Sequence, residues 1–142
     1  MAEHQAHIRW HSGGEFSHES YNKEHLAQIS GHDLPMASAN TEGFSDPEQA
    51  LAASVASCHM LTFLALAAKK RLIVEQYEDH PIAFSQAMED GRFWVSKIQL
   101  QPKVVFADDH GPSDEALKKM HEKAHHHCFI ANSLRSEVEV LS

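Results

Sequence analysis

The two cysteines are the residues of this sequence with the greatest capacity for covalent chemistry. Cys58 lies inside a long apolar segment, and Cys128 follows a run of three histidines. A thiolate is a nucleophile, and two thiols can join in a disulfide when their Cα atoms come within roughly 4.4 to 6.8 Å. A cysteine on a buried helix is otherwise a small apolar packing residue. The segments that carry the two cysteines decide between redox chemistry and packing.

The net charge of the chain argues against several classes of partner. Twenty acidic residues against twelve Lys and Arg give a formal charge of −8, which repels phosphate backbones and anionic membrane surfaces. We therefore expect no nucleic-acid partner and no membrane association. Residues 1 to 10 carry no apolar segment flanked by basic residues, and no apolar run approaches the roughly 20 residues of a membrane span. These features favour a cytoplasmic protein, in which thiols stay reduced.

Histidine is the other frequent residue type with chemical capacity, with thirteen copies. His121 and His125 are four residues apart, on one face of an expected helix, and with Cys128 they offer ligands for zinc or copper. The sequence has no CxxC or HExxH spacing, so we expect no metal and no other cofactor. His59 points about 100° away from Cys58 around a helix, which favours a core or interface histidine over a base for the thiol.

The segment that carries the first cysteine is predicted to be an apolar helix with a clear beginning. Asp46 can cap it, Pro47 suits the first helical position, and Gln49 completes a capping-box spacing. From residue 51 to residue 68 nearly every position is apolar, and the basic run 69 to 71 suits a helix C-terminus. A helix without a polar stripe must be enclosed on most sides. We expect it to be the central core helix.

The remaining segments predict a mixed α+β chain that forms one domain over residues 1 to 142. Ser113, which follows the turn-forming residues 108 to 112, can cap a second, amphipathic helix that leads to Cys128. The other expected elements are a hairpin over residues 6 to 28 with its turn at Gly13-Gly14, a loop over 30 to 45, an antiparallel pair over 72 to 90 and 92 to 106, and a strand over 137 to 141.

Two separated motifs, in this order, resemble the OsmC/Ohr family, the osmotically inducible and organic-hydroperoxide-resistance proteins. The first motif is Ser45-Asp46-Pro47-Glu48-Gln49-Ala50-Leu51-Ala52-Ala53-Ser54-Val55-Ala56-Ser57-Cys58. The second is Ala124-His125-His126-His127-Cys128-Phe129-Ile130-Ala131-Asn132-Ser133-Leu134, with Phe129 where the family commonly has Pro. The order of the expected elements agrees as well, so the resemblance covers about the whole chain.

The resemblance implies an α+β fold in which two chains intertwine as a homodimer. Two curved antiparallel sheets would wrap the paired central helices, and the active sites would form at the dimer interface. A shared core would also help a chain of this size to enclose its apolar helix.

The resemblance also implies reduction of organic hydroperoxides in oxidative stress defence. Cys58 would attack the O–O bond and become a sulfenic acid, Cys128 would condense with it to a disulfide, and a thiol or dithiol reductant would restore both thiols. Glu48 matches an acidic residue of the family's site. It lies ten residues before Cys58, about 15 Å along a straight helix, so it would act from the other subunit or across a bend. Otherwise it is a carboxylate that interacts with the helix dipole.

The sequence departs from the family at the residue that activates the thiolate. A thiolate in apolar surroundings needs positive charge or hydrogen-bond donors, and the family places an Arg in the N-terminal hairpin. Residues 13 to 25 contain no Arg, and the nearest basic residues are Arg9, His18, Lys23 and His25. The departure bears on the rate of a peroxidase more than on its fold.

Two other functions stay open from the sequence. One is a non-enzymatic protein of the same fold that senses oxidants by forming the Cys58–Cys128 disulfide or binds a small apolar ligand. The other, less favoured, is a protein that binds metal through its histidines and Cys128.

Overall fold

The structure is a computed structural model that describes residues 1–107 and 110–142. The chain forms two units, Met1–Ala50 and Leu51–Ser142, each of which is described by itself. The expected single domain over residues 1 to 142 stays a prediction. The part of the expected turn that falls on Asp108 and Asp109 lies outside the described residues.

The first unit contains an antiparallel sheet in the order β1-β2-β3, formed by His7–Arg9, His25–Ile29 and His32–Met36. The pairing of β1 with β2 confirms the expected hairpin, although the strands are shorter and Gly13-Gly14 lies within a long connection. The prediction of a loop over residues 30 to 45 is wrong for residues 32 to 36, which form β3. Ser30 and Gly31 both have positive φ, 51° and 79°, which closes a two-residue hairpin. Pro35 is tolerated because β3 is an edge strand.

Helix α1, Pro47–Lys69, begins as the sequence predicts. The Gln49 N–H donates to Asp46 Oδ1 at 2.8 Å, and the Asp46 N–H donates to Gln49 Oε1 at 2.9 Å. These reciprocal bonds form a capping box, which satisfies backbone donors that the first turn of a helix leaves free.

The antiparallel pair expected over residues 72 to 90 and 92 to 106 is four strands, which are divided between two sheets of the second unit. Strand β4, Val74–Glu78, pairs with β7, Lys103–Phe106, in one antiparallel sheet. Strand β6, Phe93–Leu100, lies between β5, Ile82–Ala87, and β8, Glu137–Val140, in the other sheet. The expectation of purely antiparallel sheets is wrong for β8, which runs parallel to β6. The helices between β6 and β8 provide the crossover that a parallel pair requires.

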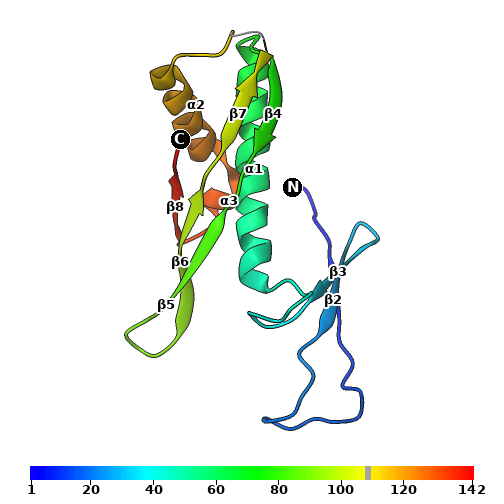
Figure 1. The fold of residues 1–142 in the computed structure, drawn as a ribbon. Coiled ribbons are helices and arrows are strands. Elements are labelled where there is room, and N and C mark those ends of the chain that lie inside the picture. The colour runs from blue at the N-terminus through cyan, green and yellow to red at the C-terminus, as the bar shows by residue number, and fades with distance from the viewer. Residues whose placement is uncertain (108–109) are drawn as a thin grey trace. The chain divides into compact units, whose positions relative to one another are not determined.

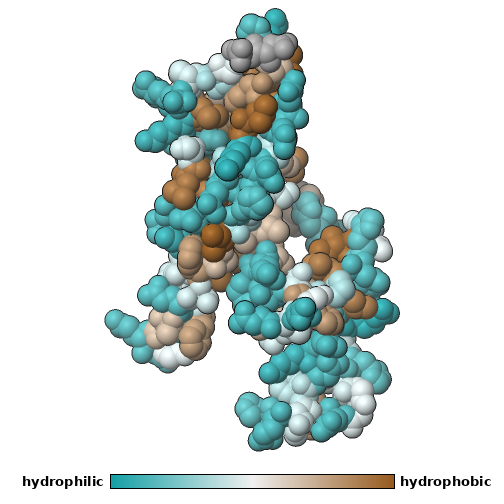
Figure 2. Space-filling model, in the orientation of Figure 1, coloured by the Kyte–Doolittle hydropathy of each residue, from teal (hydrophilic) through white to brown (hydrophobic). Residues whose placement is uncertain are grey.

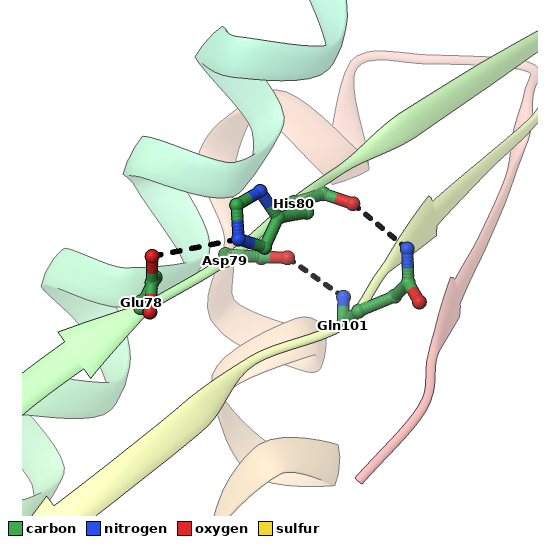
Figure 3. Close-up of polar contacts among 4 residues, drawn as sticks. All are labelled: Glu78, Asp79, His80 and Gln101. Atoms are coloured by element: carbon green, nitrogen blue, oxygen red, sulfur yellow. Dashed lines mark hydrogen bonds and ion pairs between the residues drawn. The ribbon is translucent and has the colours of Figure 1, made fainter.

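Hydrogen bonds join the short segment between β4 and β5 to the short segment between β6 and β7 (Figure 3). Asp79 Oδ1 accepts a hydrogen bond from the Gln101 N–H at 2.7 Å, and Gln101 Nε2 donates to the His80 carbonyl at 2.9 Å. The His80 ring also approaches the Glu78 carboxylate, with 3.4 Å between Nε2 and Oε1. Pro102 cannot donate to a ladder, so the long run from 92 to 106 divides here.

Helix α2, Asp114–His127, confirms the expected amphipathic helix, and the Ser113 hydroxyl accepts from the Ala116 N–H at 3.2 Å. A single turn, α3, Phe129–Asn132, follows. Figure 1 shows α2 and the strands β4 and β7 beside α1. The core has two parts: the buried residues of one are Ala52, Val55, Ala56, Ile98 and Leu100, and those of the other are Phe63, Ala67, Met120 and Ala124.

Within this chain only one face of α1 is buried, contrary to the expectation that the helix is enclosed on most sides. Ala52, Val55, His59 and Phe63 face the core, whereas Leu61 is 61% exposed. Figure 2 shows other apolar side chains at the surface among polar ones. By length and composition α1 could cross a membrane, which corrects the expectation that no apolar run reaches that length. Core helices of soluble proteins pass the same test.

Candidate functional site

Cys58 lies in the middle of α1 and is half-buried, with its side chain at the wall of a cavity. Cys128 is fully buried and ends α2. Its backbone, with φ −71° and ψ 115°, leaves the helical region, so the chain turns and begins α3. The Ala131 N–H donates to Cys128 Sγ at 3.5 Å. The thiol therefore has the place of the Ser or Thr oxygen that usually caps a helix.

The structure places these two cysteines near each other, although they are 70 positions apart in the sequence. Both are free thiols. The pKa of the Cys128 thiol is raised, and burial is the largest cause. Hydrogen bonding with Cys58 and the charge of Cys58 raise this pKa further, whereas hydrogen bonds from the Ala131 and Ile130 N–H groups lower it. A thiol that alters its neighbour's pKa in this way lies close to it.

A cavity of about 410 Å³ lies beside Cys58. Its lining from α1 is Ser54, Ser57, Cys58, Leu61 and Thr62, and its lining from α3 is Phe129 and Ile130. None of these lining residues is charged. Phe129 is 80% exposed. Sequence reasoning missed the role of this lining, although the α1 residues recur at three- and four-residue spacings on the Cys58 side of the helix.

His59 is a core histidine, as expected, and hydrogen-bonds with His121 of α2, with 3.0 Å between Nε2 and Nδ1. The pKa of each ring is lowered to about 4, with burial as the largest cause for both, and for His59 the charges of His121 and His125 contribute to this shift. Within residues 1–107 and 110–142, no three His, Cys, Asp or Glu side chains are arranged to hold a metal ion. His121 and His125 thus gain no further ligand among the described residues.

Glu48 lies in the first turn of α1 and is exposed. Its role in the site stays a prediction. The basic residues considered as substitutes for the family Arg all lie in the first unit, with Arg9 on β1, His25 on β2 and Lys23 in the connection between them. The choice among them also stays a prediction. Arg9 lines a separate cavity of about 430 Å³ together with Trp10.

Comparison with solved structures shows how widely this fold recurs. An OsmC-like protein of unknown function from Vibrio cholerae is 35% identical, with a TM-score of 0.92 and 99% of each chain covered. An organic hydroperoxide resistance protein from Elizabethkingia anophelis is 16% identical, with a TM-score of 0.74 over 99% of this chain and 93% of that one. The organic hydroperoxide resistance protein OsmC from Legionella pneumophila is 18% identical, with a TM-score of 0.70 over 99% and 96%.

No curated protein gives a significant match to this chain. The sequence profile of the OsmC-like protein family matches residues 40–141, which include both cysteines and the cavity beside them. With that match and the identity to the Vibrio cholerae protein, the chain belongs to the OsmC-like protein family.

Proposed function

We propose that this protein is a thiol-dependent peroxidase that reduces organic hydroperoxides. The observation that carries the proposal is the pair of free thiols, Cys58 and Cys128, close to each other beside an uncharged cavity. Two structural relatives named for organic hydroperoxide resistance share the fold, which supports the same role in peroxide defence.

The burial of the two cysteines supports different roles for them. Cys58 lines the cavity and is half-buried, so a peroxide can reach it. Cys128 is fully buried and its pKa is raised, so at neutral pH it stays a thiol and is a poor attacking group. Cys58 is therefore the peroxide-attacking residue, and Cys128 is the resolving residue.

The reaction balances with a peroxide and a dithiol as the two reactants. The Cys58 thiolate takes the outer oxygen of R–O–O–H, which gives a sulfenic acid and, after protonation, the alcohol R–O–H. The Cys128 thiol condenses with the sulfenic acid to a disulfide and releases water. An external dithiol then reduces the disulfide by exchange and becomes a disulfide itself. Such a cycle suits the cytoplasm, where thiol reductants are abundant.

The cavity favours a peroxide with an apolar organic part. Its volume of about 410 Å³ falls in the range of small-molecule sites. Leu61 and Phe129 present exposed apolar surface there, and burying that surface against a hydrocarbon group is favourable. Hydrogen peroxide lacks such a group and gains nothing from this contact.

A homodimer would cover the face of α1 that this chain leaves open. The exposed positions along that face are mostly small, which allows another helix to approach closely; they are Ala53, Ser54, Ser57, Leu61, Ala65 and Ala68. In such a dimer Glu48 acts on the Cys58 of the other subunit. Mixing a Glu48→Gln chain with a Cys58→Ser chain tests the sharing, because activity should recover in the mixed dimer and its absence would count against it.

One observation favours a second candidate, an oxidant sensor. The lining of the cavity in the second unit has no charged residue to stabilise the Cys58 thiolate, and slow turnover is the expected consequence. The same disulfide would then act as a signal that forms once.

The experiment that separates these functions is an assay with cumene hydroperoxide and excess dithiol. An enzyme consumes peroxide continuously, whereas a sensor consumes one equivalent and stops. Cys58→Ser should abolish consumption, and Cys128→Ser should leave the first step while preventing the intramolecular disulfide. Consumption that survives Cys58→Ser, or a wild-type protein that loses no thiol, would refute both redox functions.

A further inference from the structure

A pair of buried histidines joins the two helices that lead to the cysteines. His59 directly follows Cys58 on α1, and His121 lies on α2 seven residues before Cys128. The two rings are nearly parallel, at 7°, with centroids 5.3 Å apart, and 3.0 Å separates His59 Nε2 from His121 Nδ1. Their exposed fractions are 1% and 2%, so this polar contact is buried.

Apart from the thiol contact between Cys58 and Cys128 at the end of α2, this is the one side-chain hydrogen bond found between α1 and α2 among the described residues. The rest of their interface is apolar, with Phe63 and Ala67 of α1 in the same cluster as Met120 and Ala124 of α2. Apolar packing has little directionality, whereas a hydrogen bond fixes both distance and angle. The histidine pair therefore sets how α2 lies on α1.

The groups around the pair hold the rings in place without competing for the bond. Phe63 stacks on the His121 ring, with centroids 4.4 Å apart, and Tyr77 of β4 contacts Phe63 in turn. His125, Lys118 and Glu122 line a cavity of about 170 Å³ together with His121. No ion pair joins a carboxylate to either ring within the part of the chain that the structure describes.

We propose that His59 and His121 are positioning residues for the redox pair, whose hydrogen bond fixes α2 against α1 so that the Cys128 thiol meets Cys58. On α2, His121 and Cys128 are two turns apart and share the face that meets α1, because seven residues nearly complete two helical turns. Neither imidazole acts on peroxide or sulfur in this role. The inference rests on the Cys58–Cys128 disulfide of the proposed function.

The test is the exchange equilibrium of the full-length protein with oxidised dithiothreitol near neutral pH. Two electrons and two protons pass from the protein dithiol to the reagent, which gives the protein disulfide and reduced dithiothreitol. His121→Leu replaces the imidazole with an apolar side chain and so removes the hydrogen bond. It should lower the equilibrium constant for disulfide formation about five-fold or more, the effect of one ordinary internal hydrogen bond. His121→Gln, which can restore a polar partner for His59, should recover most of this loss.

Met120→Ala is the matched control, because Met120 is buried in the same helix interface and makes no hydrogen bond to the pair. It should destabilise the fold and leave the exchange constant within about two-fold, since it weakens dithiol and disulfide forms alike. An unchanged constant in His121→Leu, or an equal fall in Met120→Ala, would overturn the inference.

A second measurement needs no variant and serves if His121→Leu does not fold. By linkage, a disulfide that depends on the histidine contact must lower the pKa of His59 and His121 relative to the dithiol form. Ring titrations by NMR in both forms should differ, and identical curves would overturn the inference. A wild-type protein that forms no disulfide with the reagent would instead refute the proposed function itself.

Discussion

Acid should unfold this protein because of the buried His59–His121 pair. The pKa of each ring is lowered to about 4 from an ordinary value of 6.5, chiefly by burial. Between these values the unfolded chain binds protons that the folded chain does not bind. The pair therefore contributes its full stability above about pH 6.5, and that stability is lost as the pH falls towards 4. The perturbation that isolates this effect is the double substitution His59→Leu with His121→Leu.

The magnitude follows from the number of protons that the pair takes up on unfolding. One group that is fully protonated only in the unfolded state contributes about 1.4 kcal/mol per pH unit. Near pH 5.5 both rings are mostly charged in the unfolded chain and neutral in the core, so about 2 kcal/mol is lost between about pH 6 and about pH 5. Typical domains have a free energy of unfolding of about 5 to 15 kcal/mol, so this loss is large.

Urea unfolding of the reduced protein at the two pH values measures this loss, at one protein concentration because dimerisation would contribute. The double variant should lose about 2 kcal/mol less than the wild type over this range, since carboxylates and exposed histidines titrate alike in both. Replacing both partners of a buried hydrogen bond by apolar groups is often nearly neutral, so the variant should fold. Equal losses in wild type and variant would refute the assignment of two neutral, buried imidazoles.

Three further predictions concern the cavity, the core and the first turn of α1. Phe129→Ala should lower kcat/KM for cumene hydroperoxide about ten-fold, with little change for hydrogen peroxide, because it removes apolar surface from the cavity; steady-state kinetics with both peroxides checks this, and equal losses would contradict it. Ile98→Ala in the core should cost about 2 to 5 kcal/mol in urea unfolding, whereas the half-exposed Val105→Ala should cost far less. Asp46→Ala should cost about 1 kcal/mol, and no loss of stability would show that the capping box contributes nothing.

The local signals of the sequence predicted the parts of the fold that depend on neighbouring residues. The capping box of Asp46 and Gln49 and the cap at Ser113 formed as expected, because both arise within one helical turn. Strand β3 was missed because its hairpin turn, Ser30-Gly31, follows a strand of weak alternation. The parallel pairing of β8 with β6 depends on where the chain returns after α2, which no local pattern encodes.

The features of the candidate site also divide into those that the sequence predicted and those that depend on tertiary packing. The family motifs predicted Cys58 and Cys128 as the site residues, and their roles stay a prediction, although the structure places the two thiols near each other. The partnership of His59 with His121 was not predicted, because the bond joins residues 62 positions apart. The lining by Phe129 and Ile130 depends on the turn at Cys128, where the chain leaves α2 and begins α3. Such contacts follow from tertiary packing, so a linear pattern cannot reveal them.

The most direct test of the account is mass spectrometry of the reduced protein after one equivalent of cumene hydroperoxide. The chain should lose two hydrogens, and digestion without reductant should give one peptide pair joined through Cys58 and Cys128. Cys128→Ser should instead gain one oxygen on Cys58, which a sulfenic acid trap captures. A wild-type chain that keeps both thiols, or an oxygen found first on Cys128, would contradict the assignment of Cys58 as the attacking and Cys128 as the resolving residue.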